Sequence, residues 1–327
     1  MAATDVLIIQ PIHRAGLDML QAAGLRLRFA TSSDMATVAA EIPGAVAAIT
    51  RNAGLDRAAM DAAVDLRVLG NHGIGVDPID TAHASEIGLP VVFTPFANVQ
   101  SVAEQALALM LAVAKSVPAA DAATRRGDFG FKYQTPLVEL HGKTLGIVGY
   151  GRIGRRTAAL ARAAFSMPLI VYSPSVPAAA IEADGGQKAD SIDALLTEAD
   201  VVSLHAPLRP ESRNLIGAER LALMKPSSIL VNTGRGGVVD ETALIAHLQA
   251  RRSLGAGLDV FATESMPPDY PLLSLPNVVL SPHIAGSTED ALKRTAEQVA
   301  VQIIDALAGR RPEHLVNPDV WEHRRHG

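Results

Sequence analysis

The stretch Leu145-Gly146-Ile147-Val148-Gly149-Tyr150-Gly151-Arg152-Ile153-Gly154 decides the fold of this 327-residue chain. An apolar run typical of a buried β-strand leads directly into Gly149-x-Gly151-x-x-Gly154, and a helix is expected to begin near Arg152. The first glycine permits a tight turn, the second lets the backbone approach a pyrophosphate, and the third lets the helix pack closely on the strand. Free N–H groups at the helix N-terminus then bind the anion. The stretch therefore predicts a dinucleotide-binding domain.

Apolar runs alternate with helix-length segments on both sides of this turn. Six runs in the second half are predicted as strands, at 144–149, 168–172, 201–205, 228–232, 254–259 and 278–281. Four more lie at 6–9, 45–49, 67–70 and 90–93, with helices predicted at 15–23 and 55–63. This alternation favours parallel sheets covered by helices on both faces. We predict an α/β protein of two Rossmann-like, doubly wound domains with a cleft between them.

Two long helical segments are expected to connect these domains. One runs over 101–126, with a possible kink at Pro118, and the spacing of Ser101 and Glu104 matches a capping box. The other runs over 288–308 and leads to a polar tail that is expected to return to the first domain. The predicted division is a flavodoxin-like substrate (catalytic) domain, 1–99 plus 290–327, and a dinucleotide-binding Rossmann domain, 100–289.

The composition excludes several classes of function. There is no cysteine, which excludes disulfides, thiolate zinc sites and a cysteine nucleophile. The net charge is −5 and the 29 Lys and Arg are scattered, so no nucleic-acid partner is expected. The longest apolar stretch, 106–114, is too short to span a bilayer, and the N-terminal ten residues fit a strand better than a secretory signal. We therefore expect a cytoplasmic protein without a membrane partner. No histidine pair has metal-ligand spacing, so no metal is expected either.

The choice between NAD and NADP depends on the residue that follows the second strand of the nucleotide domain. An acidic side chain usually binds the ribose hydroxyls there, and Ser173 occupies the place. Without a carboxylate, nothing repels a 2′-phosphate, but no Arg or Lys is near in sequence to attract one. Both cofactors stay possible, with NAD slightly favoured.

Three polar residues follow predicted strands, where doubly wound sheets place their chemistry. Reduction of a 2-keto acid requires a cation for the substrate carboxylate, a proton donor for the developing alkoxide, and a carboxylate that stabilises the protonated donor. Arg235, His283 and Glu264 are of these types. Each alone has an ordinary structural interpretation as a loop or surface residue, but together, after a good nucleotide turn, they predict a catalytic site.

The motifs around these residues resemble the D-isomer-specific 2-hydroxyacid dehydrogenases. The similarity lies in the glycine turn, Asn232–Asp240, Leu258–Glu264 and Ser281–Gly286, with further matches at 73–77 and 98–104. It implies an oxidoreductase that moves a hydride between NAD(P)H and a small D-2-hydroxy or 2-keto acid, and a homodimer. It also implies that Arg235 binds and orients the substrate, that His283 is the acid/base, and that Glu264 is its partner.

The resemblance also implies the remaining binding residues. The predicted cofactor contacts are Gly149, Gly151, Arg152, Ile153, Gly154, Ser173, His205, Ala206, Pro207, Thr233, Asp259, Ala285 and Gly286. The backbone N–H groups of Ile74 and Gly75 are expected to cradle the substrate carboxylate, with Arg51 and His72 as further substrate contacts.

Two alternatives use the same scaffold. One is a different NAD-linked reaction, such as the oxidation of formate or phosphonate or S-adenosylhomocysteine-related chemistry. The other is a non-enzymatic corepressor that senses NAD(H), which would need a surface for docking a partner. The identity of the 2-keto acid stays open among glyoxylate, hydroxypyruvate, phosphohydroxypyruvate and larger acids.

Overall fold

A computed structural model describes residues 4–325, which divide into two compact units. Unit 1 extends to Asn98 and resumes at Gly286, and unit 2 is Val99–Ala285. The boundaries predicted from the sequence were 99/100 and 289/290. Within residues 4–325 the strands of both units pair with one another only in parallel, which confirms the predicted α/β class with two parallel sheets.

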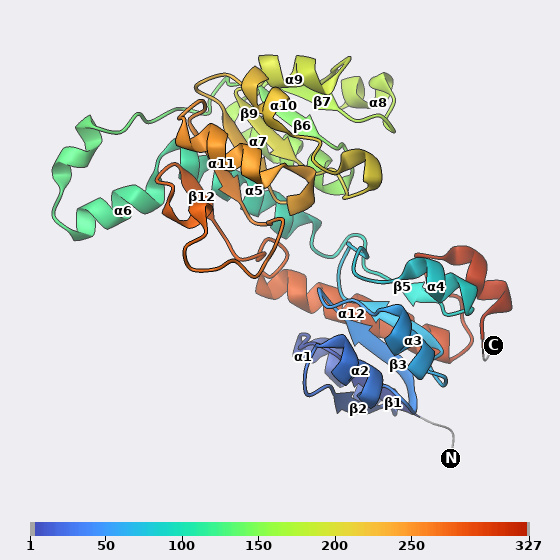
Figure 1. The fold of residues 1–327 in the computed structure, drawn as a ribbon. Coiled ribbons are helices and arrows are strands. Elements are labelled where there is room, and N and C mark those ends of the chain that lie inside the picture. Colours follow the sequence, from blue (N-terminus) through green and yellow to red (C-terminus); the bar gives the residue numbers. More distant parts are fainter. Residues whose placement is uncertain (1–3, 326–327) are drawn as a thin grey trace. The chain divides into compact units, whose positions relative to one another are not determined.

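Unit 1 is a five-stranded parallel sheet with the strand order β2-β1-β3-β4-β5 (Figure 1). This is the doubly wound order in which helices cover both faces. Its strands are β1 (Asp5–Ile8), β2 (Arg26–Phe29), β3 (Ala45–Thr50), β4 (Val68–Asn71) and β5 (Val91–Val92). Its helices are α1 (Arg14–Ala22), α2 (Met35–Glu41), α3 (Arg57–Ala62), α4 (Thr81–Glu86), α12 (Glu289–Leu307) and the 3-10 helix η5 (Pro318–His323).

Helix α12 shows why the C-terminal segment belongs to unit 1. Thr288 caps the helix by accepting a hydrogen bond from the Ala291 N–H. Val299 and Ile303 are fully buried, and a Cβ built on Gly70 of β4 would meet their side chains at 2.7 and 2.8 Å. The helix therefore packs directly on β4, whereas the sequence predicted this helix as a crossing between the domains and only the tail after it as returning to the first domain.

Unit 2 contains a seven-stranded sheet with the order β12-β11-β10-β9-β6-β7-β8. The order reverses between β6 and β9, which is the ligand-binding switch point of doubly wound sheets. Its strands are β6 (Leu145–Val148), β7 (Leu169–Tyr172), β8 (Gln187–Lys188), β9 (Val201–Leu204), β10 (Ile229–Asn232), β11 (Gly255–Leu258) and β12 (Val278–Leu280). The predicted number of six was wrong, because β8 is a short, polar edge strand.

Helices cover both faces of this second sheet. They are α5 (Val99–Ala114), α6 (Val117–Arg125), α7 (Arg152–Phe165), α8 (Ala178–Ala183), α9 (Ile192–Glu198), α10 (Ala218–Leu223) and α11 (Glu241–Gln249). Short 3-10 helices are η1 (Phe129–Tyr133), η2 (Pro210–Ser212), η3 (Gly236–Val238) and η4 (Pro271–Ser274).

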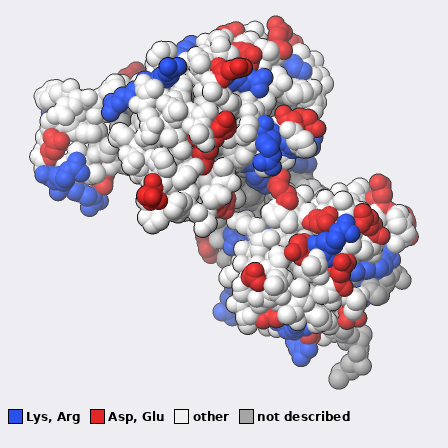
Figure 2. All heavy atoms as spheres, viewed as in Figure 1, with Lys and Arg blue, Asp and Glu red and all other residues white. Residues whose placement is uncertain are grey.

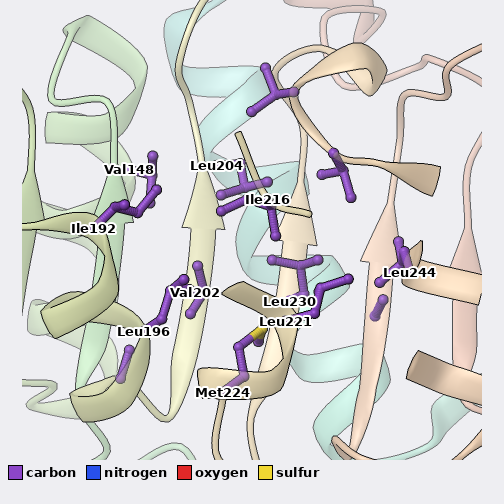
Figure 3. Close-up of a cluster of buried hydrophobic side chains, with 14 of the residues drawn as sticks. Val148, Ile192, Leu196, Val202, Leu204, Ile216, Leu221, Met224, Leu230 and Leu244 are labelled. Carbon is purple, nitrogen blue, oxygen red and sulfur yellow. The ribbon is translucent and has the colours of Figure 1, made fainter. Parts of the chain in front are cut away.

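Aliphatic side chains fill the core on one face of this sheet. Figure 3 shows Val148 beside Ile192 and Val202 beside Leu196 of α9, while Leu230 lies beside Leu221 of α10. Burying each side chain of this size stabilises the fold by roughly 1.5–3 kcal/mol. On the opposite face α5 and α7 cover the strands with mostly small and aliphatic residues. The central strands are thus apolar on both faces, as their uninterrupted apolar runs predicted.

The long helix predicted over 101–126 is in fact two helices, α5 and α6, bent by 56°. Ser116 between them has φ +48°, in the left-handed region, and Pro118 follows within the first turn of α6. The break therefore precedes the proline that was expected to cause a kink. The capping-box prediction was also wrong, because α5 begins at Val99 and Ser101 lies inside it, where its hydroxyl donates to the Ala285 carbonyl.

Among residues 4–325 no single helix is long and apolar enough to cross a membrane. The bent pair α5 and α6 meets the length and composition limits together, but α5 is largely buried in unit 2. Positive and negative side chains are interspersed on the face of each unit that Figure 2 shows.

Candidate active site

Three loops of unit 2 leave neighbouring strands at the same edge of the sheet. Asn232 of β10 is in register with Leu258 of β11, and Leu258 is in register with Leu280 of β12. Because the strands are parallel, the segments that follow them emerge side by side. The first two also touch, since a Cβ on Gly236 would meet the Phe261 backbone at 1.9 Å. This close approach requires glycine beside Arg235.

The loop after β12 and the loop after β11 together form a histidine–carboxylate pair. His283 Nδ1 lies 2.5 Å from Glu264 Oε1, and the two side chains are 32% and 50% exposed. Glutamate accepts at Nδ1, which leaves Nε2 as the ring atom that can act on a ligand. The geometry brings together two of the three predicted catalytic side chains, and the Nδ1 contact orients the ring.

His283 has an unusual backbone that needs support. Its φ is +53°, in the left-handed region that non-glycine residues rarely adopt. Asp259 provides the support, because its fully buried carboxylate accepts from the Ile284 N–H at 3.0 Å, the Ala285 N–H at 2.9 Å and Ser281 Oγ at 2.5 Å. Its carbonyl also accepts from the His283 N–H at 2.9 Å.

Asp259 was predicted as a cofactor contact, and in the structure its carboxylate is bonded to the loop that carries His283. Helix α5 adds two contacts to the same loop, from Ser101 to the Ala285 carbonyl and from Gln105 Nε2 to Ser281 Oγ at 3.0 Å. Sequence reasoning missed Ser101, Gln105 and Ser281 as site supports, because only the tertiary structure brings α5 to this loop.

Arg235 begins the 3-10 helix η3 that follows β10. Asn232 holds this turn, accepting from the Gly234 N–H and donating from Nδ2 to the Arg235 carbonyl, both at 3.0 Å. The guanidinium is half-buried and donates from Nη1 to the Gly234 carbonyl at 2.8 Å. A guanidinium is a planar fork of N–H donors, the shape that forms paired hydrogen bonds with a carboxylate.

The glycine turn is shaped for a pyrophosphate. Gly149 has φ +94°, and a Cβ there would meet the Ala206 backbone nitrogen at 2.7 Å. A Cβ on Gly154 would meet the Gly149 carbonyl oxygen at 2.3 Å, whereas a Cβ on Gly151 would enter open space. No side chain caps α7, which begins at Arg152. Open backbone at Gly151 before an uncapped helix N-terminus fits a bound anion.

Two buried polar atoms at the same sheet edge also fit a dinucleotide. His205 follows β9, and burial lowers its pKa to about 4, while its Nε2 bonds with Ser203 Oγ at 2.9 Å. The other ring nitrogen, Nδ1, and the Thr233 hydroxyl are buried without a hydrogen-bond partner among residues 4–325. Unpaired buried polar atoms are costly, so a ligand that pairs with them is favoured at this edge.

The other predicted cofactor contacts divide between the units. Ser173, Ala206, Pro207 and Ala285 lie at the strand-end edge of unit 2, whereas Gly286 lies in unit 1. A Cβ on Gly286 would meet Asn98 Nδ2 at 2.8 Å. Arg152 and Ile153 are the first two residues of α7, so their backbone N–H groups belong to its N-terminal turn.

In unit 1 the predicted substrate residues gather around the end of β4. Asn71 Nδ2 donates to the Gly73 and Gly75 carbonyls, both at 3.0 Å, and so holds the loop in shape. Within residues 4–325 no hydrogen bond is formed by the N–H groups of Ile74 and Gly75, which is the state that an incoming carboxylate requires. Asn71 was missed in the sequence, although its place at the strand end was a usable signal.

His72 and Arg51 are neighbours in this part of unit 1. Burial and the positive charge of Arg51 lower the pKa of His72 to about 4, and its Nε2 has no partner among residues 4–325. Gln10, also missed, accepts from the Arg51 and Ala53 N–H groups at 3.1 and 2.8 Å. Arg51 Nη1 donates to the Pro11 carbonyl at 3.0 Å. No cluster of three or more His, Asp or Glu that could hold a metal ion occurs in residues 4–325.

The glycine turn, the uncapped helix and the reversal of strand order define unit 2 as a dinucleotide-binding domain. Residues 107–285 match the family model described as D-isomer specific 2-hydroxyacid dehydrogenase, NAD binding domain. The chain belongs to this family, which confirms the resemblance seen in the motifs.

Named relatives and solved structures agree with this placement. A D-3-phosphoglycerate dehydrogenase of Methanocaldococcus jannaschii is 40% identical over 95% of this chain, which spans only 59% of that relative's length. A glyoxylate reductase of Korarchaeum cryptofilum is 41% identical over 81% of this chain and 80% of its own.

Two solved structures match over nearly their full length. A D-lactate dehydrogenase of Aquifex aeolicus, complexed with NAD and lactic acid, has a TM-score of 0.86 at 28% identity and covers 96% of this chain and 99% of its own. An NADPH-dependent glyoxylate/hydroxypyruvate reductase of Sinorhizobium meliloti, with NADP and malonate, has a TM-score of 0.86 at 27% identity, covering 97% and 98%.

Proposed function

We propose that this chain is an NAD(P)-dependent oxidoreductase that interconverts small 2-keto acids and D-2-hydroxy acids. The observation that carries the proposal is the His283–Glu264 pair, 2.5 Å apart, at the same sheet edge as the pyrophosphate-shaped turn. The two named relatives, a D-3-phosphoglycerate dehydrogenase and a glyoxylate reductase, support this reaction class over formate-type chemistry and over a sensing corepressor.

Each residue of the proposed site has its own role in the reaction. When bound, the nicotinamide supplies the hydride in reduction and accepts it in oxidation. Arg235 binds the substrate carboxylate through its guanidinium and orients the carbonyl. His283 donates a proton from Nε2 to the carbonyl oxygen during reduction and takes it back during oxidation. Glu264 holds Nδ1 and stabilises the charged form of the ring.

The predicted substrate contacts of unit 1 are part of the same proposal. The unpaired N–H groups of Ile74 and Gly75 would receive a carboxylate, and Arg51 with His72 would contact the rest of a small acid. Cofactor contacts are proposed at the glycine turn, at Ser173, His205 and Thr233, and at Ala285.

We further propose a homodimer located in the cytoplasm. In Figure 1, α6 and the segment after it extend away from the sheet of unit 2. Phe129 and Tyr133 on this arm are 72% and 83% exposed, which favours their burial against a second copy. Sedimentation should give twice the 34.2 kDa chain mass.

A single panel tests the reaction class. Oxidation of NADH and of NADPH is followed with glyoxylate, hydroxypyruvate, phosphohydroxypyruvate and pyruvate, and chiral chromatography analyses the product. We expect reduction of at least one acid to its D-hydroxy form. Failure with every acid while the dinucleotide binds, or formation of the L-product, would contradict the proposal.

A further inference from the structure

The end of strand β7 lies directly beside the pyrophosphate turn. The Gly149 N–H donates to the Tyr172 carbonyl at 2.9 Å, and Ser173 is the next residue, only 4% exposed. In dinucleotide-binding sheets the side chain at this place faces the adenosine ribose. Ser173 therefore decides which groups the ribose can carry.

The loop that contains Ser173 has no negative charge. Residues 169–181 include no Asp, Glu, Lys or Arg, and Ser173 and Ser175 offer hydroxyl groups instead. A carboxylate at Ser173 would repel a 2′-phosphate, whereas a hydroxyl can donate a hydrogen bond to it. The loop thus lacks the usual means of excluding NADP.

Strand β8 brings a lysine to this loop. Lys188 pairs with Val171 of β7 and is the last residue of β8, so it lies at the ligand edge of the sheet. Its Nζ donates to the Val176 carbonyl at 2.8 Å. The sequence favoured NAD slightly because no cation is near Ser173 along the chain, and the pairing of β7 with β8 supplies one in space.

The charge of Lys188 is available to a ligand. Its one side-chain hydrogen bond within residues 4–325 is to the carbonyl of Val176, which uses one of the three ammonium donors. The side chain is half-buried, and partial removal from water strengthens its attraction for an anion.

We infer that Lys188, together with the Ser173–Pro177 loop, forms a binding site for the 2′-phosphate of NADP(H). The inference rests on the proposed function for the identity of the ligand as a nicotinamide dinucleotide. It makes Lys188 a residue that determines cofactor choice, a role that the sequence did not assign.

Adenosine 2′,5′-bisphosphate and 5′-AMP test the site without turnover. Calorimetric titration of the full chain should show tighter binding of the bisphosphate. Lys188→Gln should weaken the bisphosphate by about 10- to 100-fold, the effect of losing a charged hydrogen bond, and 5′-AMP by less than about threefold. Lys188→Arg should retain most of the affinity. The control Lys143→Gln, an exposed lysine before β6, should change neither ligand's affinity.

A second variant keeps the test decisive if Lys188→Gln does not fold. Ser173→Asp leaves Lys188 in place and should weaken the bisphosphate at least about tenfold through charge repulsion, while 5′-AMP still binds. Tighter binding of 5′-AMP than of the bisphosphate by the wild type would overturn the inference. So would equal losses for both ligands in Lys188→Gln.

The outcomes also separate this inference from the proposed reaction. Bisphosphate binding that depends on Lys188, without reduction of any 2-keto acid, supports the phosphate site and contradicts the proposed reaction. Reduction driven by NADH, with no measurable bisphosphate binding, supports the reaction and overturns the phosphate site.

Discussion

Asp259→Asn should separate the positioning of His283 from the stability of unit 2. The wild-type carboxylate accepts three hydrogen bonds, from Ser281 Oγ and the Ile284 and Ala285 N–H groups. In the variant, the Asn oxygen can keep two of them, but the amide nitrogen then faces the Ala285 N–H. That leaves a buried donor unpaired, at a cost of about 1–3 kcal/mol, and the two surviving bonds lose their charge assistance.

The total loss is therefore about 2–4 kcal/mol in the free energy of unfolding, or a decrease in Tm of about 5–15 °C. The variant should also lose activity, because the strained backbone of His283 loses the hydrogen bonds that support it. A displacement of about 1 Å at the imidazole lowers kcat by roughly 100-fold. The assays are urea unfolding followed by circular dichroism and steady-state reduction of the best 2-keto acid at a temperature where the variant is folded.

Asp200→Asn is the matched control. Asp200 is a half-buried aspartate of unit 2 that accepts from the Thr144 N–H and pairs with Lys225, but it precedes β9 at the opposite edge of the sheet. It should lose stability and keep kcat within about twofold, since it supports no active-site loop. If Asp259→Asn behaves like Asp200→Asn, losing stability but not kcat, the positioning argument is refuted.

Three other perturbations test separate parts of the structure. Because burial lowers the pKa of His72 and of His205 to about 4, each neutral ring contributes stability that is present above pH 6.5 and is lost as the pH falls toward 4. Urea unfolding at pH 5 and pH 7 should differ by up to about 2 kcal/mol for each, and a flat profile would contradict this. Arg235→Lys keeps the charge but loses the fork, so kcat/KM should fall roughly 100-fold or more, and unchanged kinetics would remove Arg235 from the site. Gly151→Ala should leave Tm unchanged yet weaken dinucleotide binding at least about tenfold, because its Cβ enters the space that the phosphates occupy. Gly154→Ala should lower both the Tm and the affinity for the dinucleotide. Retained binding in Gly151→Ala would refute the phosphate assignment.

Local sequence carries the features that were predicted correctly. The glycine turn needs specific residues at each step, and the central strands are apolar on both faces, so the turn and the sheet class could be recognised directly. Arg235, Glu264 and His283 could be singled out as catalytic candidates because they follow such strands, where parallel sheets place polar residues.

The features that were missed are the edge strands of the sheets and the contacts between residues far apart in sequence. Strands β2 and β8 were not predicted, because edge strands are partly exposed and lack a continuous apolar run. The break at Ser116 and the support of the His283 loop by Asp259 and Ser101 have no local signal. Lys188 is 15 residues from Ser173, and only the pairing of β7 with β8 brings it to the same loop.

In the proposed reaction His283 transfers the proton while a separate part of unit 2 binds the dinucleotide. The most direct test is His283→Gln, with kcat for the best 2-keto acid and the Kd for the reduced dinucleotide measured on the same preparation. We expect kcat to fall by about 100- to 10,000-fold, with Kd changed by less than about threefold. A variant that retains kcat within about tenfold, or loses dinucleotide binding in parallel with turnover, would contradict the account.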